Sequence, residues 1–93
     1  MATRKTLIVE RYGVLEVELK KHMKAELFPS LDSVDVADLV YLITISFLGV
    51  DSEEQYSAKI RELMDGNGVE VDAPTFAIVA PLIREFVAWM KQL

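Results

Sequence analysis

An uncharged apolar run near the middle of the chain is the feature that most constrains the fold. No residue from Leu39 to Val50 is charged. Within the run, polar side chains occur only at Tyr41, Thr44 and Ser46. A helix that is apolar on nearly every face has to lie inside a bundle. We therefore expect this segment to be the central helix, with the other segments packed around it.

The residues at the two ends of this run favour a helix. Asp35 or Ser33 can serve as the helix N-cap, and Asp35 and Asp38 suit the positive end of the helix dipole. Gly49 is well placed to end the helix. The many β-branched residues would also fit a strand, but the length of the run argues for the helix. The pattern predicts a helix over residues 35–48.

Helical spacing continues on both sides of this segment. Apolar residues three and four positions apart predict a helix near residues 8–28, which Pro29 ends. Further on, Ser52 and Gln55 have the spacing of a capping box, in which each side chain bonds the backbone of the other residue. This motif predicts the start of a third helix, near residues 53–65.

Two prolines shape the C-terminal part of the chain. Pro74 fits the first position of a helix. Pro81 disfavours helical geometry at the residue before it. The pattern therefore predicts a short helix over residues 75–79 and a last helix over residues 81–92.

Length and composition are typical of one globular domain. The chain has 93 residues, of which 52% are apolar and 27% are charged. We predict an all-α fold, a compact bundle of four to five helices that spans residues 1–93 as a single domain. Residues 1–6 are polar, and we expect them to be disordered.

Several classes of protein are disfavoured by what the sequence lacks. It has no cysteine, which excludes disulfides and Cys-ligated zinc, and His22 is its only histidine. We therefore expect no metal and no cofactor. No Gly-rich phosphate loop and no set of catalytic residues is visible, so we expect the chain not to be an enzyme. The longest uncharged run is too short for a membrane span of about 20 residues.

Charge is distributed unevenly along the chain. The formal net charge is −5, with about +2 over residues 1–30 and −7 over residues 31–93. An acidic surface repels phosphate backbones, so nucleic acid is disfavoured as the main partner. Lys20, Lys21 and Lys24 form a basic patch on the first predicted helix. A direct RNA contact through this patch is one alternative, and a solvated face balanced by neighbouring glutamates is the other.

The order of these features resembles a known family. An apolar helix of the form Val36–Ile43 follows a first amphipathic helix. A helix ending in Ile60–Met64 comes next, and a final helix carries Phe86 and Trp89. This order is similar to that of PWI-like helical domains over residues 12–92. The closest likeness is to the amino-terminal domains of nuclear poly(A)-RNA-binding and mRNA-export proteins.

The resemblance implies a function and a site. It implies a nuclear protein-docking module in mRNA processing or export. Independently, we expect a monomer, because the sequence shows no long heptad seam and no large spare apolar face. In the export branch of that family the docking surface includes aromatic residues of the last helix. By resemblance, a partner peptide or helix would dock beside Phe86 and Trp89, with Arg84 and Glu85 at the rim.

A second class of function also fits a chain of this size and charge. Small acidic helical proteins serve as phage assembly factors, such as tail-assembly chaperones, which bind a hydrophobic segment of a partner transiently. A cytoplasmic location would accompany that alternative. Both readings describe a non-catalytic protein that binds another protein.

Overall fold

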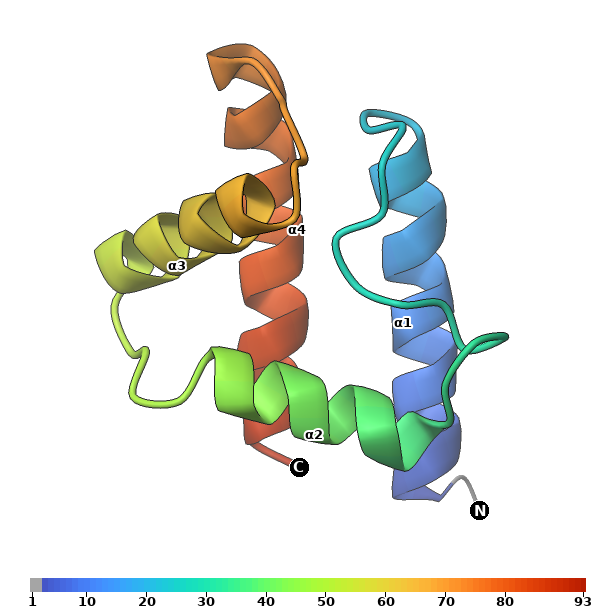
Figure 1. Ribbon diagram of the computed structural model, residues 1–93. Coiled ribbons are helices and arrows are strands. Elements are labelled where there is room, and N and C mark those ends of the chain that lie inside the picture. The colour runs from blue at the N-terminus through green and yellow to red at the C-terminus, as the bar shows by residue number, and fades with distance from the viewer. Residues whose placement is uncertain (1–2) are drawn as a thin grey trace.

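Four helices and no strand make up the part of the chain that the computed structural model describes, residues 3–93. They are α1 (Arg4–Lys20), α2 (Val36–Ser46), α3 (Glu53–Gly66) and α4 (Ala73–Lys91), shown in Figure 1. The predicted all-α bundle is confirmed, with four helices.

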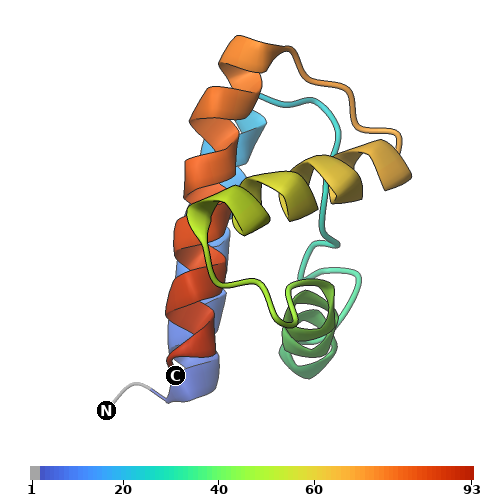
Figure 2. The ribbon, with the colours of Figure 1, turned by 90° about the vertical axis from the view of Figure 1, so that its left-hand side faces the viewer.

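The helices form two layers. α1 and α4 run antiparallel, side by side, while α2 and α3 cross the same side of this pair (Figures 1 and 2). α4 packs against all three other helices. The largest fully buried side chains come from α2, α3 and α4 and the turn after α2: Phe47, Leu39, Ile43, Ile60, Met64, Ile83, Val79 and Val87.

The helix predicted over residues 8–28 is shorter and begins earlier. Thr3 caps α1, because its side-chain oxygen accepts a hydrogen bond from the amide of Thr6. The prediction of disorder over residues 1–6 is therefore wrong from Thr3 onward, and residues 1 and 2 lie outside the described part. α1 ends at Lys20. The segment that follows is not a regular helix, but three of its apolar side chains are buried in the core: Met23, Leu27 and Phe28.

One hydrogen bond shows why α1 cannot extend to Phe28. The hydroxyl of Tyr12 donates to the carbonyl of Pro29 at 2.7 Å. A continuous helix would separate these two residues by about 25 Å, at about 1.5 Å per residue. The segment after α1 therefore folds back along the helix, and the buried position of the phenol raises the pKa of Tyr12 above its usual range.

α2 and α3 lie within two residues of their predicted ends. Asp35 caps α2, and its carboxylate accepts a hydrogen bond from the amide of Asp38 at 2.9 Å. Gly49 follows the helix with a φ of 76°, a conformation that favours glycine. The capping box of Ser52 and Gln55 is present at the start of α3, with both of its reciprocal bonds formed. These two helices depend on local signals that sequence reasoning can read.

The predicted division of the last segment at Pro81 is wrong. α4 is one helix with Pro81 inside it, and it begins with Asp72 as N-cap. A proline in a helix interior removes one backbone hydrogen bond. Here the flanking residues Val79 and Ile83 are fully buried, so tertiary packing offsets this penalty.

The predicted central position of α2 is also wrong. α4 is the helix that contacts all the others, while α2 lies at one end of the layer that it shares with α3. The first turn of α1 and the C-terminus lie at that same end of the molecule (Figures 1 and 2). α2 packs against α1 and α4, while Tyr41, Leu42 and Ile45 remain exposed, so its apolar surface is only partly covered.

The continuity of α4 predicts an effect of replacing Pro81. Pro81→Ala restores the missing amide inside a regular helix, and we expect the free energy of unfolding to rise by about 1–3 kcal/mol. Urea denaturation followed by circular dichroism measures the change. Pro74→Ala is the matched control, because Pro74 lies in the first turn, and it should change stability by less than about 0.5 kcal/mol. Unchanged or lower stability of Pro81→Ala would contradict a regular helix at this position.

Candidate functional site

α2 is apolar on two opposite sides, and only one of them is covered. Leu39, Ile43 and Phe47 recur at four-residue intervals and are fully buried. Away from the core, four large apolar residues are open to solvent: on α2, Tyr41 with an exposed fraction of 59%, Leu42 with 42% and Ile45 with 55%, and in the turn after α2, Leu48 with 77%. We call these four residues the α2 face.

Clustering distinguishes the α2 face from ordinary exposed apolar residues. Single exposed apolar side chains are normal on protein surfaces, but adjacent ones on one element mark interaction sites. Tyr41 and Ile45 are one helical turn apart, and Leu48 follows in the turn after α2. Tyr41 adds a hydroxyl to an apolar ring, a combination common at protein interfaces. The α2 face therefore has the composition of a binding surface.

Contacts from α3 and α4 hold the end of α2 that carries this face. The ammonium of Lys91 donates hydrogen bonds to the carbonyls of Phe47 at 2.7 Å and Val50 at 2.8 Å. The ring of Phe47 stacks on that of Tyr56, with 5.7 Å between centroids. Carbonyls at a helix C-terminus attract cations, so Lys91 serves as a cap supplied by another helix. The face is thus presented on a fixed element.

Acidic residues border the α2 face on both sides in the sequence. Three precede it and three follow it: Asp32, Asp35, Asp38, Asp51, Glu53 and Glu54. No lysine, arginine or histidine occurs between residues 25 and 58. Of the six carboxylates, only that of Glu53 forms an ion pair within the described residues, with Arg84 at 2.9 Å.

The predicted docking residues of α4 lie on different sides of the helix. Phe86 is only 3% exposed, and its ring packs against Tyr12 at 5.6 Å and Trp89 at 5.9 Å. Arg84 points to α3, where it pairs with Glu53. Phe86 is therefore a core residue, and replacing it with aspartate would test folding rather than docking.

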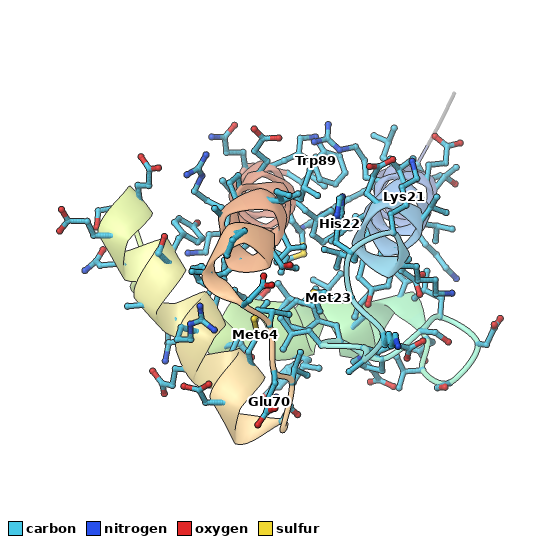
Figure 3. All side chains as sticks on the ribbon, turned by 90° about the horizontal axis from the view of Figure 1, so that it is seen from above. Lys21, His22, Met23, Met64, Glu70 and Trp89 are labelled. Carbon is cyan, nitrogen blue, oxygen red and sulfur yellow. The ribbon has the colours of Figure 1, made fainter. Side chains whose placement is uncertain are left out.

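Trp89 lies on the outer side of the α1–α4 pair. Figure 3 shows it between these helices, away from α2 and α3. The guanidinium of Arg11 covers its ring at 4.5 Å from the centroid, which leaves Trp89 partly buried. A cation over an indole ring is a favourable contact within the chain itself. Arg11 therefore occupies the ring face that a partner would use.

A shallow groove of about 210 Å³ runs nearby between α1 and α4. Leu15 and Phe86 are its buried lining residues, while Val14 and Glu85 are exposed. Glu85 is thus the predicted residue that does lie at the rim of an open surface. The groove has fewer exposed large apolar residues than the α2 face, and its charged lining residues carry both signs: Arg11, Glu18 and Glu85.

The three predicted RNA-contacting lysines do not share one helix. Lys20 ends α1, Lys21 is its C-cap, and Lys24 lies in the segment beyond. Lys21 pairs with Glu18 at 2.8 Å, and this bond lowers the pKa of the Glu18 carboxyl. Lys20 and Lys24 line a pocket of about 70 Å³ together with Glu16 and Glu26. Carboxylates are interleaved with the lysines, so the region is not a continuous basic surface.

His22 lies exposed at the end of α1. It lines an open pocket of about 310 Å³ together with Glu70, between the segment after α1 and the connection from α3 to α4. Within residues 3–93, no group of three or more histidine, aspartate or glutamate side chains is placed to hold a metal ion. By length and composition alone α4 could cross a membrane. Its apolar residues instead form the centre of this fold, which accounts for the same composition.

Comparisons of the chain with protein-family models, with curated proteins and with solved structures find no match. Function is therefore inferred from the chain's own surface.

Sequence reasoning missed the α2 face, although a signal for it was present. The buried and exposed residues of α2 alternate with helical periodicity, with Leu39 and Ile43 on one side and Tyr41 and Ile45 on the other. A helix with two apolar sides predicts either a central position or an open binding surface. The flanking acidic residues do not decide between the two, because all of them except Asp38 lie outside α2, where they would be solvated in either case.

The cap from Lys91 predicts a specific loss of stability. Lys91→Met keeps most of the side-chain volume but removes the ammonium that two carbonyls share. We expect the free energy of unfolding to fall by about 1–2 kcal/mol, and the amides of α2 to exchange faster with solvent. Denaturation and hydrogen exchange measure the two effects. Lys59→Met, which removes only a surface ion pair with Glu62, is the control and should change stability by about 0.5 kcal/mol or less. Equal effects of the two substitutions would contradict the cap.

Proposed function

We propose that this chain is a non-catalytic docking module that holds a helical segment of another protein on the α2 face. The observation that carries the proposal is the exposure of Tyr41, Leu42 and Ile45 on one side of α2, whose other side is core, and of Leu48 in the turn that follows. Burying such residues against a partner removes apolar area from water, at roughly 25 cal/mol per Å².

The shape of the surface favours a helix as the bound segment. An extended peptide usually binds by adding a strand to a sheet edge, and residues 3–93 contain no sheet. The α2 face is a convex row of side chains on a helix, and such rows pack by interlocking with the side chains of a second helix. Tyr41 to Leu48 spans about 10 Å of helix, which two to three turns of a partner would cover.

Rigidity supports the same proposal. The end of α2 that carries the face is tied to α4 by Lys91 and to α3 by the stacking of Phe47 on Tyr56. A preformed surface loses little conformational entropy on binding. The wider setting of this module, in nuclear mRNA processing or in phage-type assembly, stays a prediction from the sequence.

A selection experiment tests the docking site. A displayed library of random amphipathic helical peptides is selected for binding to the wild-type chain. Ile45→Asp removes one exposed side chain from the centre of the face. Val17→Asp is the matched control, because Val17 is also on a helix and is 58% exposed. We expect the selected peptides to bind Ile45→Asp at least tenfold more weakly than the wild type, and to bind Val17→Asp unchanged.

Two results would overturn this proposal. One is a selection that enriches no peptide, and the other is a set of peptides whose affinity does not depend on Ile45. Both variants change only exposed residues, so circular dichroism should show wild-type helix content in each.

A further inference from the structure

Most of the carboxylates that flank the α2 face lack an ion-pair partner within residues 3–93. Asp38 is exposed in the first turn of α2, and Asp51 is exposed just after the turn that ends the face. Neither side chain forms an ion pair within residues 3–93, and the same holds for Asp32, Asp35 and Glu54. The acidic charge at both ends of the face is therefore free to act on a partner.

Basic residues from other elements do not neutralise this charge. Lys91 directs its ammonium to two backbone carbonyls, and Arg84 is paired with Glu53. Arg4 and Lys5 lie in the first turn of α1, at the same end of the molecule as α2 (Figures 1 and 2). They are outnumbered by the carboxylates that flank the face in the sequence.

A second copy of this chain is a poor occupant of the face. If two α2 helices pack in an antiparallel manner, Asp38 of one copy approaches Asp51 of the other. If they pack in a parallel manner, each of these carboxylates approaches its own equivalent. Like charges across an interface disfavour association, so both arrangements are repelled at both ends. A nucleic acid or an anionic membrane surface is repelled for the same reason.

We infer that the partner segment is a cationic amphipathic helix: an apolar stripe of two to three turns that covers the α2 face, with lysine or arginine at both ends of the stripe. This inference rests on the proposed docking function and adds the charge of the partner to it. The apolar stripe supplies the affinity. The basic residues pair with Asp38 and Asp51, which fixes the position of the segment and speeds its association.

Two synthetic peptides test the inference. The cationic peptide has a leucine stripe of three turns with lysine and arginine at both ends, and the anionic peptide has glutamate at each of those basic positions. Fluorescence anisotropy measures the dissociation constant of each peptide at 50 and 300 mM salt. We expect the cationic peptide to bind the wild type at least tenfold more tightly than the anionic peptide, and to lose several-fold in affinity at the higher salt concentration.

Matched variants separate charge from apolar contact. The double variant Asp38→Asn, Asp51→Asn should weaken binding of the cationic peptide several-fold and should not weaken binding of the anionic one. The control is Asp65→Asn, Glu70→Gln, which removes two exposed carboxylates near the end of α3 and should change neither affinity. Ile45→Asp should abolish binding of the cationic peptide.

The outcomes distinguish this inference from the docking proposal on which it rests. Equal affinity for the two peptides, lost in Ile45→Asp, would overturn the cationic partner and leave docking on the α2 face intact. Absence of any binding by the cationic peptide would also overturn the inference. Binding that persists in Ile45→Asp would overturn docking at this face. A dimer of the wild type in sedimentation experiments, absent in Ile45→Asp, would make a second copy the occupant and overturn the inference.

Discussion

Burial of α4 against the other three helices is the constraint on which the rest of the structure depends. Val79, Ile83 and Val87 have no exposed surface, and they lie on α4, which packs against each of the other three helices. The hydrophobic effect acts on area rather than direction, so a wide apolar helix favours neighbours on several sides. α1 and α3 make most of the helix contacts of α4. α2 is then placed by the last turns of α4, where Lys91 binds the carbonyls at the end of α2.

This arrangement leaves α2 with an excess of apolar surface. One side supplies Leu39, Ile43 and Phe47 to the core, and the bundle contains no fifth helix within residues 3–93 to cover the other side. Exposed apolar residues on a fixed helix, next to unpaired carboxylates, form a surface suited to a partner with an apolar stripe and positive charge. The apolar residues of α2 that the core does not cover are thus the ones available to bind a partner.

The parts of the fold that sequence reasoning predicted well depend on local chemistry. The capping box of Ser52 and Gln55 and the cap of Asp35 act within a few residues, so they are visible without tertiary structure. The end of α1 was not predictable in this way. Met23 and Leu27 have helical spacing in the sequence, but they belong to an irregular segment that buries their side chains in the core. The hydrogen bond from the Tyr12 hydroxyl to the carbonyl of Pro29 holds this segment in place.

Packing also decided the outcome at Pro81 and at the predicted docking residues of α4. Local geometry at Pro81 argued for a break, but the buried residues around it keep α4 continuous. For the candidate site, the family resemblance pointed to Phe86 and Trp89, and the structure places one in the core and the other beneath Arg11. Which apolar residues remain exposed is a property of the assembled bundle, so the α2 face became visible only in the structure.

The most direct test of this account measures solvent contact of individual methyl groups in α2. A soluble paramagnetic chelate broadens the NMR signals of methyl groups that it can approach. At low protein concentration, we expect strong broadening for Leu42, Ile45 and Leu48, and protection for Leu39 and Ile43. Equal protection of all five residues would mean that the chain covers the α2 face by itself, and it would contradict the central claim that this face is open for a partner.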